Sequence, residues 1–218
     1  MPAKPTTTST ANQELLHYLL EGNRQAASGV IHDMTNKNIP VMDIYEQSLK
    51  TTLYRIGELW ENNEITVAEE HVATSITEAI MNELYYKIVS RTRKPYNVVL
   101  GCVETEQHQV GIKMVADVFE MKGWDTWFPG ANIPVDDLIR FTKEKQPDMI
   151  ALSASIHAHM PIMEKMLKAI HQHFTLPVLV GGQAFLHGGQ EITKQFPRTT
   201  YIANLQELAS HIDQVTDE

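Results

Sequence analysis

A short polar segment, Glu106-Gln107-His108-Gln109-Val110-Gly111, brings together residue types that can bind a metal or a metal-containing cofactor. A neutral imidazole such as that of His108 can ligate a metal ion through one ring nitrogen. The carboxylate of Glu106 could accept a hydrogen bond from the other ring nitrogen and orient the ring. Gly111 has no Cβ, so a bulky group could approach the backbone there. The segment therefore indicates a metal site with His108 as the ligand.

The position of this segment in the chain supports that interpretation. Residues 97–103 are an apolar run typical of a buried strand, and residues 110–123 have the apolar spacing of a helix. His108 therefore lies in the loop after a strand, at the edge where open α/β sheets bind their ligands. A single histidine in a polar loop is more often merely solvated, so the other strand ends decide between the two interpretations.

Two further strand ends carry small residues. The apolar run at 148–153 leads into Ser153-Ala154-Ser155, and the run at 177–180 leads into Gly181-Gly182. Together with acid-x-His-x-x-Gly, these motifs resemble the cobalamin-binding domain of methionine synthase and its relatives. The resemblance implies that His108 replaces the cofactor's own benzimidazole below cobalt. It also implies that the nucleotide tail of the cofactor passes the remaining motif residues, which are Ser153, Ser155, Gly181 and Gly182.

One position departs from this family. The family usually has aspartate where this chain has Glu106. We expect the longer side chain still to reach His108. His157 and His159 follow Ser155 at the same edge, and we favour ordinary loop positions for both over contacts with the corrin or its tail.

The elements that must position these residues alternate regularly in the second half of the chain. This alternation predicts a five-stranded, doubly wound parallel α/β domain over residues 96–218, of the Rossmann-like or flavodoxin-like class. The expected strands are 97–103, 125–128, 148–153, 177–180 and 199–202, and the expected helical stretches are near 110–123, 134–145, 160–173, 185–195 and 204–214.

The first part of the chain has a different pattern. Residues 1–11 are rich in Thr, Ser, Pro and Ala and are expected to form a flexible arm, with a helix opening near Asn12. Residues 12–90 carry apolar residues at helical spacing and predict a four-helix bundle. Thr66 is the expected N-cap of the fourth helix, with Glu69 as its capping-box partner. A basic, proline-ended linker, 91–95, follows.

The bundle carries a second motif, in which nine residues separate Trp60 from Glu70-His71. In an arbitrary bundle these would be a helix-end tryptophan and a solvated face. Before a cobalamin-type domain, the spacing is similar to that of cobalamin-dependent photoreceptors of the CarH type. That resemblance implies that the bundle covers the upper face of the corrin, that Trp60 packs against an adenosyl group, and that Glu70 and His71 line the same pocket.

Two departures limit this second resemblance. CarH-type proteins have an amino-terminal helix-turn-helix domain, whereas only about a dozen residues precede the bundle here. They also usually have a histidine directly after the tryptophan, where this chain has Glu61. We therefore expect that a light signal would pass to a separate protein partner, and that no second histidine takes cobalt by that route.

Composition narrows the function classes. A formal net charge of −9 over 218 residues argues against direct binding of nucleic acid, which needs a cationic face. The single cysteine, Cys102, excludes an internal disulfide. The start of the sequence lacks the long apolar segment of a signal peptide or membrane span, so a cytoplasmic protein is expected.

The sequence therefore predicts a cobalamin-binding light sensor. The expected cofactor is adenosylcobalamin, with methylcobalamin as the other form considered, and self-association is left open. The main alternative is a corrinoid carrier that moves methyl groups between methyltransferases. A third is the cobalamin subunit of a radical mutase, which would need a separate catalytic barrel.

Overall fold

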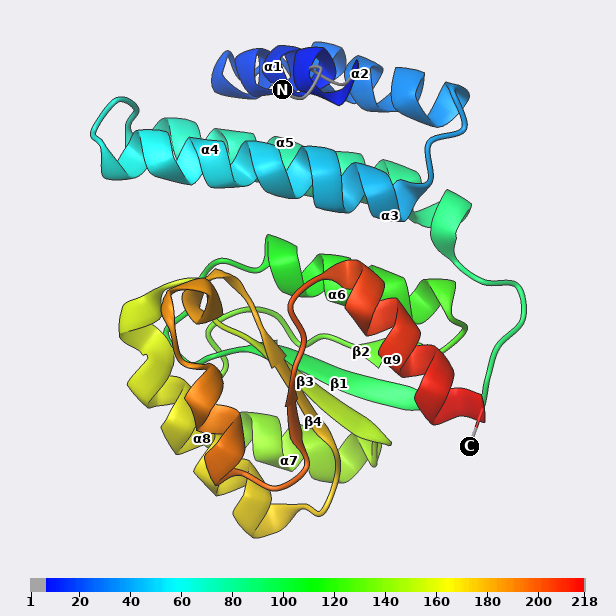
Figure 1. The fold of residues 1–218 in the computed structure, drawn as a ribbon, viewed down its shortest axis with the longest axis vertical. Helices are drawn as coiled ribbons and strands as arrows, with labels where there is room; N and C mark the ends of the chain where they lie inside the picture. Colours follow the sequence, from blue (N-terminus) through cyan, green and yellow to red (C-terminus); the bar gives the residue numbers. More distant parts are fainter. Residues whose placement is uncertain (1–6, 218) are drawn as a thin grey trace, which may run out of the picture. The chain divides into compact units, whose positions relative to one another are not determined.

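The computed structural model describes residues 7–217, which divide into two compact units at the Ile88–Val89 bond. The first unit is helical and the second is an α/β layer structure (Figure 1). Among the described residues, no helix is long and apolar enough to cross a membrane.

The first unit is the expected four-helix bundle. Its third helix is continuous from α3 to α4 through a π-helical turn, η1, so three labelled segments form one long element. Buried aliphatic side chains from every helix fill its centre, Leu15, Leu19, Ile31, Leu49, Ile56, Ile80 and Leu84 among them. The elements are α1 (Thr7–Leu20), α2 (Arg24–Asn36), α3 (Val41–Ile44), η1 (Tyr45–Leu49), α4 (Lys50–Glu61) and α5 (Val67–Ile88).

The start of α1 differs from the prediction. The helix begins at Thr7, so residues 7–11 of the expected arm are helical, and residues 1–6 lie outside the described residues. Directly after this stretch, the side-chain amide of Asn12 donates to the carbonyl oxygen of Gln47 at 2.8 Å. A tertiary contact of this kind outweighs the weak helix propensity of threonine and serine, which costs only a few tenths of a kcal/mol per residue.

The start of α5 matches the predicted capping box. The Thr66 amide donates to Glu69 Oε2 at 2.7 Å, and the Glu69 amide donates to Thr66 Oγ1 at 3.3 Å. These reciprocal bonds satisfy two amide groups at the helix end. They fix where the helix begins, and so place Glu70 and His71 in its opening turns.

The second unit is built on one parallel sheet in the order β2-β1-β3-β4-β5. This is the predicted doubly wound fold. Its strands are β1 (Asn97–Cys102), β2 (Asp125–Trp127), β3 (Met149–Ser153), β4 (Val178–Gly181) and β5 (Thr199–Tyr201), and its α-helices are α6 (Val110–Met121), α7 (Val135–Lys145), α8 (Met160–His173) and α9 (Leu205–Asp217).

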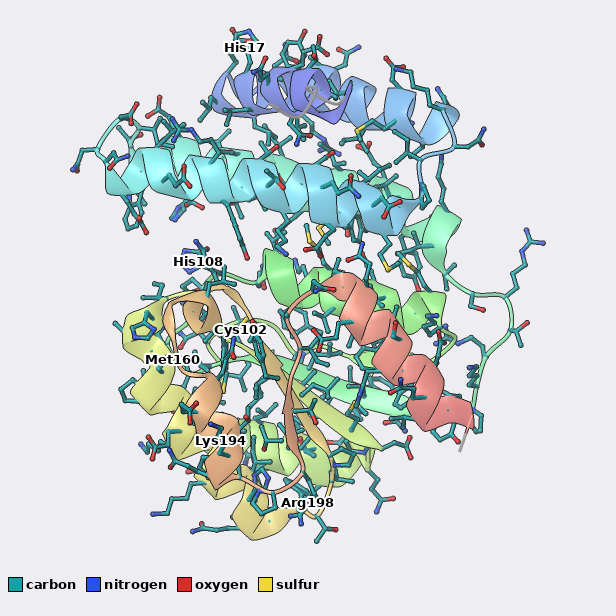
Figure 2. All side chains as sticks on the ribbon, in the orientation of Figure 1. His17, Cys102, His108, Met160, Lys194 and Arg198 are labelled. Atoms are coloured by element: carbon teal, nitrogen blue, oxygen red, sulfur yellow. The ribbon has the colours of Figure 1, made fainter. Side chains whose placement is uncertain are left out.

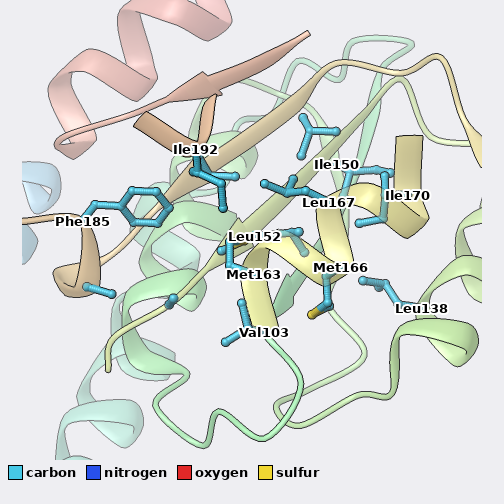
Figure 3. Close-up of a cluster of buried hydrophobic side chains, with 14 of the residues drawn as sticks. Val103, Leu138, Ile150, Leu152, Met163, Met166, Leu167, Ile170, Phe185 and Ile192 are labelled. Atoms are coloured by element: carbon cyan, nitrogen blue, oxygen red, sulfur yellow. The ribbon is translucent and has the colours of Figure 1, made fainter. Parts of the chain in front are cut away.

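Helices cover both faces of this sheet. Figure 1 shows α6 and α9 on one face and α7 and α8 on the other. Figure 3 shows the core between the sheet and α8, where Ile150 and Leu152 of β3 meet Met163 and Met166 of α8. The central strands β1, β3 and β4 are buried on both faces, which is why they appear in the sequence as continuous apolar runs rather than alternating ones.

The stretch 185–195 is not the helix that was predicted. Two 3₁₀ turns, η3 (Gln183–His187) and η4 (Gln190–Gln195), replace it. Gly188 and Gly189 separate the turns with φ angles of 105° and 100°. Such backbone angles lie outside any right-handed helix, so the glycine pair ends one turn before the next begins.

The basic linker is part of the second unit. The Arg93 guanidinium donates to Glu120 Oε2 and to the carbonyl oxygen of Trp124, both at 2.6 Å. The Lys94 amide donates to the carbonyl oxygen of Gly123 at 2.8 Å. These bonds hold the linker against the end of α6 and the start of β2.

Candidate functional site

The predicted site lies at the point where the strand order reverses. From β1 the chain passes to β2 on one side, and from α7 it returns to β3 on the other side. Cys102 at the end of β1 is paired in register with Ser153 at the end of β3. Figure 2 shows His108 in the loop beyond β1, before α6 begins. Doubly wound sheets bind ligands at such a switch point.

Glu106 is the centre of this edge. Its side chain is 0% exposed, and its Oε1 atom accepts hydrogen bonds from two groups of His108. One is the His108 backbone amide at 3.1 Å, and the other is the ring Nδ1, with which Oε1 makes a short contact. The longer glutamate side chain therefore does reach the histidine in this chain.

The second carboxylate oxygen of Glu106 holds the other strand end. Its Oε2 atom accepts from the backbone amides of Ser155 at 3.1 Å and Ile156 at 3.2 Å, in the loop after β3. Nδ1 of His159 lies 3.1 Å from the same oxygen. One buried carboxylate thus ties the loop after β1 to the loop after β3.

These donors keep Glu106 ionised. Burial by itself would raise the pKa of its carboxyl group, but the hydrogen bonds from the His108 ring and backbone, with that from Ser155, lower the pKa to about 2. At neutral pH the group is a carboxylate that can only accept hydrogen bonds. Nδ1 of His108 must therefore carry the hydrogen in that contact.

The tautomer of His108 follows from this bond. With the hydrogen on Nδ1, a neutral imidazole has its lone pair on Nε2, and that is the form that ligates metals. The His108 side chain is 49% exposed, whereas the carboxylate behind it is fully buried. A carboxylate behind a histidine raises the basicity of the ligand and fixes the ring. One oriented imidazole suits a metal that a macrocycle already holds, as a corrin holds cobalt.

The loop that carries Glu106 is held in a strained conformation. Thr105 has a φ angle of 73°, which is rare for a β-branched residue. The Thr105 amide donates to Asn132 Oδ1 at 3.0 Å, and the Asn132 amide donates to the Glu106 carbonyl oxygen at 3.0 Å. Asn132 comes from the loop between β2 and α7. Its role was missed in the sequence, where the only signal is a polar residue in a Gly130-Ala131-Asn132 turn.

A weaker chain of contacts runs from Ser153 through Cys102. The Ser153 hydroxyl donates to Cys102 Sγ at 3.7 Å, and the Cys102 thiol donates to the His108 carbonyl oxygen at 3.6 Å. Burial raises the pKa of the Cys102 thiol to about 11, so the group stays protonated and can donate. Ser153 thus supports the His108 loop from β3, and a contact of Ser153 or Ser155 with a nucleotide tail stays a prediction.

The Gly181-Gly182 pair has a role in the fold itself. Gly182 has a φ angle of 109°, and a Cβ placed there would lie 2.2 Å from the carbonyl oxygen of Ala154. A Cβ at Gly181 would lie 2.9 Å from the carbonyl oxygen of Ile202. Both glycines allow backbone segments to approach closely, so substitution at either would disrupt the unit whether or not a ligand binds. Space for a tail beside them stays a prediction.

Gly111 can test whether a cofactor lies at this edge of the sheet without the disruption of the fold expected at Gly181 and Gly182. It lies exposed in the first turn of α6, and no heavy atom of the described residues lies within 4 Å of a Cβ placed there. Gly111→Ala should stabilise the helix by roughly 0.5–1 kcal/mol, because glycine is the poorer helix former. If a cofactor lies against this backbone, Gly111→Phe should nevertheless weaken cobalamin binding by overlap.

Thermal unfolding and cobalamin titration of the two Gly111 variants check this prediction. Gly57, in α4, likewise has no heavy atom of the described residues within 4 Å of an added Cβ and supplies the matched control as Gly57→Ala. A Gly111→Phe protein that is folded and binds cobalamin as the wild type does would show that nothing bulky lies against this turn.

The bundle places the second motif at one end of two helices. Trp60 is in the last turn of α4, and Glu70 and His71 are near the start of α5, across the short turn at 62–66. The Trp60 side chain is 45% exposed. Glu70 Oε1 accepts from Thr74 Oγ1 at 2.8 Å, while Oε2 lies 3.5 Å from His71 Nε2. The three residues gather at the same end of the bundle, with a large aromatic surface open.

Family models match both units. Residues 96–198 match a model described as a B12 binding domain, and residues 11–85 match a second model with the same description. The first match covers β1 to the end of η4, and with them every site residue of the α/β unit named above. The second covers Trp60, Glu70 and His71.

Individual relatives fall into two groups. The HTH-type transcriptional repressor CarH of Myxococcus xanthus is 29% identical over 149 residues, which are 67% of this chain and 49% of that protein. The chain thus spans about half of CarH. Dimethylamine corrinoid protein 3 of Methanosarcina acetivorans is 24% identical over 149 residues, which are 66% of this chain and 70% of that protein.

A solved structure shares the fold. The Methanosarcina barkeri monomethylamine corrinoid protein superimposes with a TM-score of 0.81, covering 96% of this chain and all of that one, at 14% sequence identity. Bundle and α/β unit therefore occur together in a known structure.

Proposed function

This chain belongs to the B12-binding domain family and binds cobalamin, and we propose that it is a light sensor that uses adenosylcobalamin. In this proposal His108 is the ligand below cobalt, and the bundle residues Trp60, Glu70 and His71 meet the upper ligand. A change in the state of the upper ligand then alters self-association or contact with a protein partner.

The observation that carries the proposal is the exposed ring of Trp60. It is at the same end of α4 and α5 as Glu70-His71, at the spacing that resembles the CarH-type motif. Because single exposed apolar side chains are normal on protein surfaces, the spacing of the motif supports a binding site here and exposure alone does not. The identity of the chain to CarH supports the same function.

Bound adenosylcobalamin supplies a cobalt–carbon bond that visible light breaks. Trp60 would respond by losing the surface on which it packs. A tryptophan side chain has about 250 Å² of surface, and covering the open 45% of it contributes roughly 2–3 kcal/mol at about 25 cal/mol per Å². That difference between two states could change their population ratio by a factor of about 30–150.

The alternative function is a corrinoid carrier for methyl transfer. Glu61 favours it, because the residue directly after Trp60 is not the histidine usual in CarH-type proteins. The identity to dimethylamine corrinoid protein 3 supports the same alternative. A carrier must leave its upper face open to methyltransferases, whereas a sensor must couple that face to its own conformation.

The response of the protein to light distinguishes the light sensor from the corrinoid carrier. Free adenosylcobalamin is itself light-sensitive, so the measurement must follow the protein. We expect size-exclusion elution and limited proteolysis of the holoprotein to differ between darkness and green light. Trp60→Ala should remove the difference. Tyr86→Ala, which removes an 88% exposed aromatic residue of α5 outside this motif, should keep it.

Identical elution and identical proteolysis in darkness and light would reject the sensor. The carrier would then be the function to test, by incubating the reduced holoprotein with a methyl donor and a corrinoid methyltransferase.

A further inference from the structure

His159 contacts the carboxylate oxygen of Glu106 that the ring of His108 does not contact. It ends the 3₁₀ turn η2 (His157–His159), directly before α8, and its side chain is 19% exposed. Nδ1 of His159 lies 3.1 Å from Glu106 Oε2. The carboxylate oxygen accepts, so this nitrogen donates in the neutral or protonated ring alike.

The donors around Glu106 divide between its two oxygens. Oε1 accepts only from the His108 residue, through the ring and the backbone amide, among the bonds that the structure gives it. Oε2 accepts from the segment after β3, through Ser155, Ile156 and His159. The His108 ring is thus oriented by a carboxylate whose other oxygen is held from β3.

This division matters because the last torsion of a glutamate side chain has a broad, shallow energy profile. The two backbone amides of Ser155 and Ile156 donate to Oε2, and the His159 ring adds a side-chain donor on that oxygen. Removing that donor leaves the carboxylate plane less restricted. The direction of the bond to His108 Nδ1 then varies, and with it the direction in which Nε2 points.

We propose that His159 is a positioning residue for the ligand below cobalt, because it fixes Glu106 and through Glu106 the ring of His108. His159 would thereby set the fraction of bound cobalamin that has His108 beneath the metal. The inference rests on the proposed role of His108 and adds a residue that no motif of the sequence assigns.

A pair of nearly isosteric variants isolates the hydrogen bond. Asparagine places its amide nitrogen where histidine has Nδ1, so His159→Asn can keep the bond to Glu106 Oε2. His159→Leu has a similar shape and no donor. His157→Leu is the matched control, because His157 lies in the same turn and its Nδ1 is 3.1 Å from the carbonyl oxygen of Ala184 rather than from Glu106.

The readouts are the absorbance signature of axial ligation and the dissociation constant for cobalamin, with thermal unfolding of the unloaded protein beside them. We expect His159→Leu to lower the histidine-ligated fraction and to weaken binding by up to about 10-fold. The roughly 10–100-fold that follows loss of a direct outer partner of a metal ligand is the upper limit, because His159 contacts the ligand only through Glu106. His159→Asn and His157→Leu should keep the wild-type spectrum.

A second variant covers the case in which the leucine protein does not fold. His159→Gln is polar but places its donor at the position of Nε2, so it should lose the histidine-ligated signature too. A wild-type spectrum and affinity in His159→Leu or His159→Gln would overturn the proposal, as would an equal loss in His157→Leu.

His108→Ala measured in parallel separates the two proposals. An unchanged spectrum in His108→Ala would reject the assignment of His108 as the lower ligand, and the proposed role of His159 would be rejected with it. A changed spectrum in His108→Ala together with an unchanged one in His159→Leu would reject only the role of His159.

Discussion

Glu106→Leu is expected to lower the free energy of unfolding of the α/β unit by about 3–5 kcal/mol, the range found when one partner of a buried ionic group is removed. The substitution leaves the amides of His108, Ser155 and Ile156 without the carboxylate that now satisfies them. Each buried donor that loses its acceptor costs about 1–3 kcal/mol. The loops after β1 and β3 also lose the group that ties them together.

Urea unfolding followed by circular dichroism measures this effect. Because the chain has two compact units, the unfolding transition of the α/β unit must be resolved from that of the bundle. Glu104→Leu is the control, because it removes a neighbouring carboxylate and leaves the donors of Glu106 paired. If the two leucine variants unfold at the same urea concentration, Glu106 does not stabilise the α/β unit by the expected amount.

At acid pH the free energies of unfolding of the wild type and Glu106→Leu should differ less than at neutral pH. The pKa of Glu106 is about 2 in the folded chain against an ordinary value of 4.5. A carboxyl group with a lowered folded-state pKa stabilises the fold fully above pH 4.5, and this contribution is lost as the pH falls through 2. The difference of 2.5 pKa units (4.5 minus 2) corresponds to about 3 kcal/mol. A gap between the two proteins that stays constant from pH 5 to pH 2 would contradict a carboxylate with this pKa.

His108→Ala is expected to have the largest effect on cobalamin. It removes the Nε2 lone pair, which no neighbouring side chain of the 106–111 segment can supply with the same orientation. Binding should weaken by at least the roughly 10–100-fold that follows loss of an outer partner at metal sites. The absorbance of the bound cofactor should shift toward the form without an axial base below cobalt.

Cobalamin titration of the variant checks this result, with His173→Ala as the control. His173 is an exposed histidine at the end of α8, where its Nδ1 lies 3.0 Å from the carbonyl oxygen of Ala169. An unchanged spectrum and an unchanged affinity in His108→Ala would contradict the assignment of His108 as the lower ligand.

The α/β fold could be predicted because its signals are local. Buried parallel strands such as 97–102 and 149–153 form continuous apolar runs, and the helices between them have apolar residues at helical spacing. The capping box at Thr66 is local as well, since its partners are three residues apart. Such patterns are read from neighbouring residues without any knowledge of the fold.

The missed features depend on contacts between distant residues. His159 meets Glu106 across 53 residues, and Asn132 meets Thr105 across 27. Their geometry is set by loops that fold around the buried carboxylate, so no spacing in the sequence marks them. The same holds for Gly182, whose φ angle and close approach to Ala154 are properties of the packed sheet edge.

The position of His108 beneath cobalt has a direct spectroscopic test. Electron paramagnetic resonance of the bound cobalt(II) cofactor reports which nitrogen lies on the axis of the metal. In protein made with nitrogen-15 histidine, we expect the axial nitrogen splitting to change from the threefold pattern of nitrogen-14 to a twofold pattern. A threefold pattern that persists in the labelled protein would place the cofactor's own benzimidazole below cobalt and contradict the site built on Glu106 and His108.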